Sequence, residues 1–304
     1  MWLAGFSFIF LIDPVCLSQE LQKYNPDREL IEGIVIPNTE LIKIHSDIVG
    51  DDYLIYVQLP MSYKQNPDKT YPVWYNTDAN RGFPFLANSV TFLTFPPGDI
   101  PEMVVVGIGY LTKGMEEWAA LRTRDLTPTQ NTETDEFWTK TLAEMSGRTD
   151  LTVRSGGAAL FLEFIIQELL PYIESHYRVD PGNRTLGGYS YGGLFTLYAL
   201  FKNPGIFSKY FAGSPSLHYD NEISFTYEND FAEMHQDLNA EVFITVGGLE
   251  GDIMVNQVQQ MTDRLLSRQY PNLKVNLQIF ENEDHRSCLG AAFFRAIYVL
   301  HKDK

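Results

Sequence analysis

The sequence predicts an α/β fold with a mostly parallel central sheet, an antiparallel N-terminal hairpin and helices on both faces. Three observations support this. Two β-rich runs, at 41–45 and 53–59, flank Gly50-Asp51-Asp52 and predict a hairpin. The continuous apolar run at 103–109 is typical of a strand buried on both faces of a parallel sheet. From residue 160 onward, helical and strand patterns alternate, which favours parallel strands joined by helices.

The remaining elements are expected in chain order. A strand at 71–77 is followed by a loop at 78–82. A helix is expected at 160–177, where Pro171 kinks or interrupts it. After residue 190 we expect, in turn, a helix at 194–201, strands at 209–215 and 241–246, a helix at 254–270, a strand at 275–280 and a helix at 291–301.

The segment 113–157 has weak periodicity and is rich in Thr, Asp and Glu. Trp118, Phe137 and Trp138 are its large apolar anchors. A long segment of this kind within one domain is usually a lid or a binding loop, and otherwise a disordered insertion. We therefore predict a lid-like insertion at 113–157.

Length and composition limit the possible classes of protein. The 304 residues suffice for one large domain, which we expect at 19–304. A net charge of −16 disfavours nucleic acid and anionic membranes as partners, because both need a basic patch. Two cysteines cannot make a disulfide framework. The six histidines form no metal-binding motif, so neither a metal nor another cofactor is expected.

The first residues differ from the rest. Residues 2–12 are apolar, too few to span a bilayer but suited to the core of a signal peptide. We expect a signal peptide at 1–18, cleaved after Ser18, and hence a periplasmic or secreted protein with no stable membrane insertion. The alternative is a buried N-terminal strand, which would leave the protein in the cytoplasm.

The stretch from Arg184 to Gly193 carries the strongest chemical signal. A strand pattern runs through Gly-Tyr-Ser-Tyr-Gly at 188–192 into an apolar helical pattern, the context of a G-x-S-x-G nucleophile elbow. Ser190 would lie on a strained turn with its hydroxyl above the sheet edge. Gly188 and Gly192 would allow the close approach of strand and helix. The alternative is a glycine-rich turn in which the serine is incidental.

Two further groups follow later strands in the order serine, acid, histidine that is expected of α/β-hydrolases. His285 directly follows the last strand, where its imidazole could take the proton of the Ser190 hydroxyl. Glu250 and Asp252 follow the strand at 241–246, and either could orient that imidazole. Glu250 is favoured because it is closer to the strand end, with Asp252 as the alternative acid and a Ser/His dyad as the third possibility.

An oxyanion hole would complete the site. The Tyr191 N–H lies in the first helical turn after Ser190, and the second N–H is expected from Ala79 or Asn80. The alternative for the latter two is a plain surface loop.

Nearby cations and aromatic side chains are candidates for substrate binding. Cations beside the site could bind an anionic or catecholate group. The alternative is that they pair with acids such as Asp78, Glu283 and Asp125, and that the aromatic rings are structural. The candidates are Arg81, Arg286, Trp118 and Trp138, with Arg122 and Arg124 as further nearby cations.

Five motifs together carry a resemblance to a known family. They are Arg-Thr-Arg-Asp-Leu-Thr-Pro at 122–128, Tyr-Arg-Val-Asp-Pro at 177–181, the elbow at 187–194, Gly-Ser-Pro-Ser-Leu at 213–217 and Gly-Leu-Glu at 248–250. From about residue 40 onward the chain resembles the putative-esterase family of α/β-hydrolases, and most of all its trilactone siderophore esterases of the enterobactin, salmochelin and bacillibactin type. The resemblance implies Ser190 as nucleophile and His285 as base. The elbow departs from the Gly-His-Ser-Met-Gly-Gly of S-formylglutathione hydrolases, which disfavours that activity.

The residues and the resemblance predict the same activity. We expect a serine esterase that cleaves small-molecule carboxylic esters through an acyl-enzyme, with a siderophore trilactone as a candidate substrate. A feruloyl or acetyl esterase acting on small or polysaccharide-linked esters is the first alternative. Acyl transfer to an acceptor alcohol and a non-catalytic binding protein on the same fold are the others.

Overall fold

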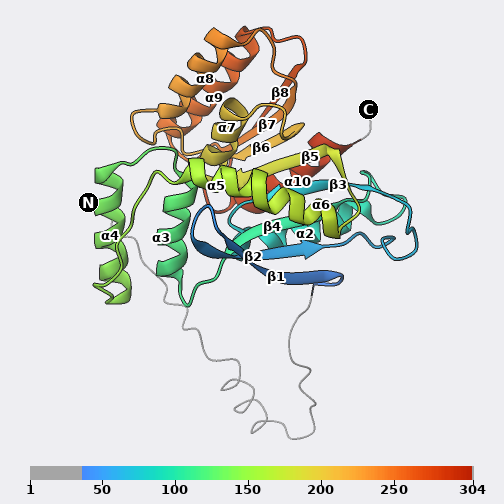
Figure 1. The fold of residues 1–304 in the computed structure, drawn as a ribbon. Coiled ribbons are helices and arrows are strands. Elements are labelled where there is room, and N and C mark those ends of the chain that lie inside the picture. The colour runs from blue at the N-terminus through green and yellow to red at the C-terminus, as the bar shows by residue number, and fades with distance from the viewer. Residues whose placement is uncertain (1–35, 303–304) are drawn as a thin grey trace, which may run out of the picture. The chain divides into compact units, whose positions relative to one another are not determined.

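The computed structural model describes residues 36–302, which are built around an eight-stranded sheet (Figure 1). The strand order is β1-β2-β4-β3-β5-β6-β7-β8. The strands are β1 (Thr39–Ser46), β2 (Asp51–Gln58), β3 (Tyr71–Asn76), β4 (Val104–Tyr110), β5 (Val179–Tyr189), β6 (Lys209–Gly213), β7 (Ala240–Gly247) and β8 (Leu273–Phe280). β2 pairs antiparallel with β1 and β4, and every other neighbouring pair is parallel. The predicted mostly parallel sheet with an antiparallel N-terminal hairpin is confirmed.

Helices cover both faces of this sheet. α2 and α10 pack on one face, against inward side chains such as Trp74, Val105 and Phe211. The other helices pack on the opposite face or on one another (Figure 1). The helices are α2 (Ala79–Thr94), α3 (Met115–Leu126), α4 (Thr132–Ser146), α5 (Ala158–Phe164), the π-helical η1 (Ile165–Leu169), α6 (Leu170–His176), α7 (Tyr191–Lys202), α8 (Ile223–Met234), α9 (Asp252–Ser267) and α10 (Cys288–His301).

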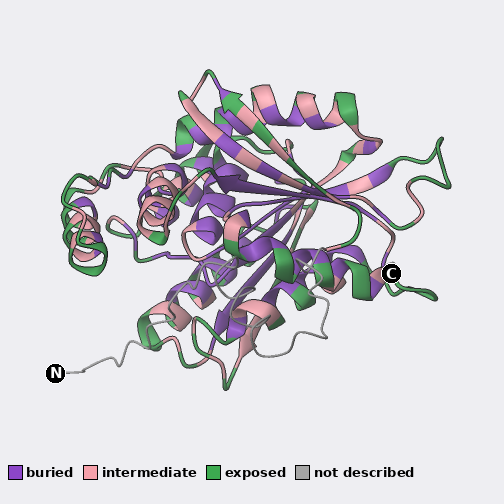
Figure 2. Ribbon diagram, turned by 90° about the horizontal axis from the view of Figure 1, so that it is seen from below, coloured by how far each residue is buried: buried purple, intermediate pink, exposed green. Residues whose placement is uncertain are grey.

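Burial follows the sequence pattern. All seven residues of β4 are buried, as expected for a continuous apolar strand in the middle of a covered sheet. β1, at one edge, is largely exposed or half-buried. Figure 2 shows the central strands buried along most of their length, with the exposed residues on the outer sides of the helices and in the loops. Packing in the core therefore fixes the positions of the parallel strands. Their carboxyl ends are where a site is expected in this kind of sheet.

The loop predicted at 78–82 is wrong, because α2 begins at Ala79. Gly82 and Pro84, which are unfavourable inside helices, both lie within α2, but seven buried residues hold the helix on the sheet. The close approach of α2 depends on glycine in β4. A Cβ on Gly107 would lie 2.7 Å from the Ala79 Cβ, so a larger residue there would displace the start of α2.

The segment 113–157 contains two helices that its weak periodicity did not predict. The Asn131 side chain caps α4 by accepting from the Thr134 N–H, and Gly147 ends it with φ 72°. α3 packs on α5 and α7, so the segment is joined to the rest of the sheet's covering layer. Whether it acts as a lid stays a prediction.

The helical run predicted at 160–177 forms as three consecutive pieces. α5 passes into the π-helical turn η1, and α6 follows with Pro171 near its start. Because proline has no N–H to donate, the regular hydrogen-bonding pattern is broken at this point.

The predicted signal peptide at 1–18 lies outside the described residues. Between residues 36 and 302, no helix combines the length and the apolar character needed to cross a membrane.

Candidate active site

Ser190 occupies a sharp turn between a strand and a helix. β5 ends at Tyr189 and α7 begins at Tyr191, so Ser190 is the single residue between them. Its φ of 62° and ψ of −118° are a strained conformation for a residue with a side chain. The Ser190 N–H donates to the Gly213 carbonyl at 2.9 Å, and its carbonyl accepts from the Leu194 N–H at 3.0 Å. Both neighbouring elements therefore hold the turn.

The glycines on each side of Ser190 are required by close packing. A Cβ on Gly188 would lie 2.4 Å from the Gly192 carbonyl and 2.6 Å from the Thr77 hydroxyl. A Cβ on Gly192 would lie 2.4 Å from the same hydroxyl. Thr77 also donates its N–H to the Gly187 carbonyl at 3.0 Å, so the end of β3 is fixed against the elbow.

His285 and Glu250 meet at the carboxyl edge of the sheet. Nδ1 of His285 lies 2.6 Å from Oε2 of Glu250, and the Glu250 side chain is only 2% exposed. Glu250 comes from the loop after β7, and His285 from the loop after β8. A carboxylate bonded to Nδ1 keeps Nε2 free to accept a proton, which is the arrangement that a general base needs.

The second oxygen of Glu250 is also bonded. Its Oε1 accepts from the Ser214 hydroxyl at 2.6 Å and from the Gly247 N–H at 2.7 Å. Burial alone would raise the pKa of Glu250, but the hydrogen bonds from His285, Ser214 and Gly247 outweigh it and hold that pKa below its usual value. Glu250 therefore stays ionised at neutral pH. Asp252, the alternative acid, is the exposed first residue of α9.

The predicted oxyanion residues lie at two helix starts. Tyr191 is the first residue of α7, where backbone N–H groups lack partners within the helix. Ala79 and Asn80 are the first two residues of α2, and Ala79 is buried. The Asn80 side chain is bonded on both sides to the Tyr110 backbone, at 2.7 and 2.9 Å, so only its main chain is available to a ligand.

Comparison with known proteins identifies the family. The family described as "Putative esterase" matches residues 146–283. The ferri-bacillibactin esterase BesA of Bacillus subtilis strain 168 is 31% identical over 281 residues, which cover 89% of this chain and 92% of that protein. The chain belongs to this esterase family. Its reaction class is the hydrolysis of esters.

Two further relatives extend this finding. The siderophore triacetylfusarinine C esterase of Aspergillus fumigatus is 25% identical over 300 residues, 89% of this esterase and 95% of that one. The crystal structure of the BES protein from Bacillus cereus superimposes with a TM-score of 0.77 at 28% identity, covering 90% of this chain and 98% of the other. The likeness therefore extends over about nine tenths of the chain.

Two of the arginines near the site of the esterase are already paired. Arg122 contacts both carboxylate oxygens of Asp78 at 2.7–3.0 Å. Arg124 is held by Asp51 and Asp125 at 2.6–3.1 Å. For Arg122 and Arg124, the structure therefore contains the ion pairs with nearby acids that were the alternative to substrate binding.

Arg81 and Arg286 differ from those two. Both side chains are exposed, and neither makes an ion pair with any residue between 36 and 302. The Arg81 guanidinium lies 5.1 Å from the centre of the Trp118 ring. These two cations can therefore still interact with a ligand.

The predicted tryptophans contact residues close to Ser190. Trp118 of α3 packs on the guanidinium of Arg122 at 5.0 Å, and Trp138 of α4 donates its N–H to the Tyr191 hydroxyl at 3.3 Å. Both rings are half-buried. Each tryptophan thus makes a contact within the protein, and part of its side chain remains exposed to solvent.

Three residues of the loop after β6 lie close to the site but were not predicted from the sequence. Ser214 bonds to Glu250, and the Ser216 hydroxyl lies 3.4 Å from that of Ser190. The pKa of His218 is lowered by burial and by the charge of His285, which places the two imidazoles within electrostatic reach. Ser214 and Ser216 belong to the motif at 213–217, and His218 directly follows it. This motif begins at the end of β6, at the same sheet edge as the elbow, which was the signal that could have found them.

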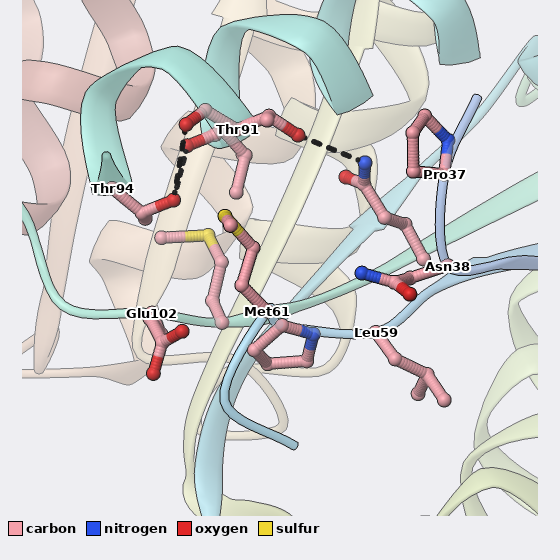
Figure 3. Close-up of a pocket in the computed structure, with 11 residues that line it drawn as sticks. Pro37, Asn38, Leu59, Met61, Thr91, Thr94 and Glu102 are labelled. Atoms are coloured by element: carbon pink, nitrogen blue, oxygen red, sulfur yellow. Dashed lines mark hydrogen bonds between the residues drawn. The ribbon is translucent and has the colours of Figure 1, made fainter. Parts of the chain in front are cut away.

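A cavity of about 160 Å³ lies away from these residues (Figure 3). Its walls come from the end of β2, the start of β4 and the last turns of α2, including Leu59, Met61, Thr91 and Glu102. Because β4 begins here and the elbow follows the carboxyl end of β5, the cavity is at the opposite edge of the sheet. It includes none of the predicted site residues.

Proposed function

We propose that this esterase works through a serine nucleophile and an acyl-enzyme. The observation that carries the proposal is the Glu250–His285 pair at 2.6 Å, at the same sheet edge as Ser190 on its strained turn. A buried carboxylate on Nδ1 and a raised serine between a strand and a helix are the parts that this mechanism needs.

In the first half-reaction the Ser190 oxygen forms a bond to the ester carbonyl carbon. His285 Nε2 takes the hydroxyl proton, and Glu250 stabilises the imidazolium that results. When the tetrahedral intermediate collapses, the bond from that carbon to the alcohol oxygen breaks, and the proton passes from His285 to the leaving oxygen. The products are a free alcohol and an acyl-Ser190 ester.

Water completes the cycle by the reverse sequence. His285 takes a proton from water, whose oxygen attacks the acyl carbon. The bond to Ser190 then breaks, the proton returns to the serine oxygen, and the carboxylic acid leaves. In both halves the negative oxygen is stabilised by the Tyr191 N–H and by a second N–H from Ala79 or Asn80.

The substrate class that we favour is a siderophore trilactone. Two similar proteins bear the names of siderophore esterases, for ferri-bacillibactin and for triacetylfusarinine C. Arg81 and Arg286 support the proposal, because exposed cations that form no ion pair with a residue between 36 and 302 can attract a catecholate or another anionic group despite the net charge of −16.

A substrate panel tests this choice. We would compare purified enzyme and its Ser190→Ala variant on a ferric and an iron-free catecholate trilactone, p-nitrophenyl butyrate and methyl ferulate. The proposal predicts trilactone kcat/KM values well above those of the two simple esters, and no turnover by Ser190→Ala. Fast ferulate or butyrate cleavage without trilactone turnover would instead support a general or feruloyl esterase.

The apolar run at 2–12 further supports export of the enzyme to the periplasm or the medium. N-terminal sequencing of the protein purified from its native cells would find Gln19 at the new terminus if residues 1–18 are removed as proposed.

A further inference from the structure

Tyr189, the residue before Ser190, contacts the predicted general base. Its ring packs against the His285 imidazole, with centroids 5.1 Å apart and planes at 50°. Its hydroxyl donates to the His285 backbone carbonyl at 3.0 Å. The Tyr189 side chain is 7% exposed, so this contact is nearly shielded from water. One residue of the elbow thus binds both the ring and the main chain of His285.

Ser214 links Tyr189 to the acid. It directly follows β6, is fully buried, and lies 2.6 Å from Glu250 Oε1 and 2.8 Å from the Tyr189 hydroxyl. An ionised carboxylate only accepts, so Ser214 donates its proton to Glu250. The Tyr189 hydroxyl, which the Ser214 hydroxyl also contacts, donates its own proton to the His285 carbonyl. The hydroxyl groups of Ser214 and Tyr189 thus connect the Glu250 carboxylate to the His285 main chain.

This arrangement fixes which oxygen of Glu250 faces the imidazole. Oε1 accepts from the Ser214 hydroxyl and the Gly247 N–H, so Oε2 is left for His285 at 2.6 Å. Without the Ser214 hydroxyl, the carboxylate would have more freedom to rotate. A shift of about 1 Å in a catalytic group can lower a rate by about 100-fold.

We infer that Tyr189 and Ser214 are positioning residues that hold the Glu250 and His285 side chains in the orientation that the proposed reaction at Ser190 requires. The inference rests on the serine mechanism proposed above and adds two side chains to it. Tyr189 acts through the backbone of His285, and Ser214 through the free oxygen of Glu250. Ser214 is fully buried and Tyr189 is 7% exposed, so both act through the pair and not directly on a substrate.

Each hydroxyl has its own kinetic signature. Tyr189→Phe keeps the ring contact and loses the hydrogen bonds of the hydroxyl with the His285 carbonyl and with Ser214, so kcat should fall by about 10-fold while KM changes by less than about two-fold. Removing the Ser214 hydroxyl leaves more of the negative charge of Glu250 facing the imidazolium. The acid limb of the pH–rate profile should then move to higher pH, because imidazolium is better stabilised.

Other titratable groups near the pair are left unchanged by both variants. They are His218 after β6 and Glu283, Asp284 and Arg286 in the loop of His285. Cys288 at the start of α10 differs, because its thiol contacts the Tyr189 hydroxyl and loses that contact in Tyr189→Phe. A shift of the acid limb that appears only when Ser214 is changed therefore reports on Glu250 and His285.

The glycine variant suits the backbone at Ser214. Its φ of 37° lies in the left-handed region, which glycine adopts without strain. Ser214→Gly therefore removes the hydroxyl and relieves the backbone, and Ser214→Ala serves as a second variant. Tyr210→Phe on β6 and Ser224→Ala on α8 are matched controls, because both remove a buried hydroxyl elsewhere.

The experiment is steady-state hydrolysis of p-nitrophenyl butyrate from pH 5 to 9 by the full chain and these variants. Circular dichroism would establish that each variant is folded. We expect lower kcat in Tyr189→Phe, a shifted acid limb in both Ser214 variants, and unchanged profiles in the two controls. The Tyr189→Phe/Ser214→Gly double variant should lose less than the product of the single losses.

Two outcomes separate this inference from the mechanism beneath it. Wild-type kcat and an unshifted profile in the Tyr189 and Ser214 variants, together with an inactive Ser190→Ala, would overturn the inference and leave the mechanism standing. Activity in Ser190→Ala would overturn the mechanism itself.

Discussion

The guanidinium of Arg122 and the carboxylate of Asp78 form a two-pronged ion pair, with three nitrogen–oxygen distances of 2.7–3.0 Å. Each side chain is 13% exposed. Arg122 also lies between the rings of Trp118 and Tyr191, about 5 Å from each centre. Asp78 immediately precedes α2, with a φ of 55°. The pair therefore joins α3, which carries Arg122, to the start of the helix that carries Ala79 and Asn80.

Removing one partner of this pair should be costly. Arg122→Met leaves the Asp78 carboxylate largely buried without its cation, and we expect a loss of about 3 kcal/mol in the free energy of unfolding. The double variant with Asp78→Asn should lose less than the sum of the two single losses, because no unpaired charge remains. Urea denaturation measures all three. Equal stability of wild type and Arg122→Met would contradict this reading of the pair.

Glu250 and Asp252 form a matched pair for mutation. Glu250→Gln cannot stabilise the imidazolium of His285, so we expect kcat to fall by about 10²–10⁴-fold. Asp252→Asn changes an exposed carboxylate two residues away and should leave kcat within about two-fold. Steady-state kinetics on one ester substrate compares them directly. If Asp252→Asn were the more damaging change, Glu250 would not be the acid.

The elbow leaves no space for a side chain at Gly188. In Gly188→Ala the new methyl group would lie 2.4 Å from the Gly192 carbonyl, and we expect a destabilisation of about 1–3 kcal/mol with loss of activity. Gly182→Ala is the control, since its methyl group would lie 3.3 Å from the Asp180 carboxylate, its nearest neighbour. Thermal unfolding should separate the two variants clearly. A Gly188→Ala enzyme as stable and active as wild type would mean that the packing at the elbow is looser than described.

His301 should make stability depend on pH. It is 3% exposed and bonds to Thr185 and Lys209, and burial together with the positive charge of Lys209 lowers its pKa to about 3. Between that value and the usual histidine pKa of about 6.5, the unfolded chain binds a proton that the folded chain does not. The free energy of unfolding should therefore decrease as the pH is lowered, by about 2 kcal/mol from pH 7 to pH 5.

The variant His301→Gln isolates this effect, because glutamine does not titrate. The difference in unfolding free energy between wild type and His301→Gln should change by about 2 kcal/mol, to the disadvantage of wild type, between pH 7 and pH 5. A difference that stays constant over this range would show that His301 is not held neutral in the folded protein.

Much of the fold could be predicted because the strands and turns have characteristic residue patterns within short stretches of the sequence. The buried run that became β4, the Gly-Asp-Asp turn between β1 and β2 and the glycine pattern around Ser190 each depend on nearby residues alone. The candidate triad followed from which loops succeed which strands, since parallel strands end at one edge of the sheet. That part of the candidate site could therefore be proposed from the sequence.

Other features depend on contacts between distant residues. α2 contains Gly82 and Pro84, which weaken a helix locally, and the packing that holds it comes from β4 and α10, so the nearby sequence alone did not predict it. The roles of Tyr189 and Ser214 depend on β5, β6 and β7 being neighbours in that order. Their spacing along the chain gives no sign of which hydroxyl meets Glu250.

The most direct test of the serine mechanism is covalent labelling of Ser190. Wild-type enzyme treated with diisopropyl fluorophosphate should gain one diisopropylphosphoryl group, found on Ser190 by peptide mass spectrometry, and lose its esterase activity in proportion. Ser190→Ala should take up no label and hydrolyse esters at least about 10⁴-fold more slowly than wild type. An unlabelled wild-type enzyme that hydrolyses esters, or a Ser190→Ala variant with normal turnover, would contradict the mechanism.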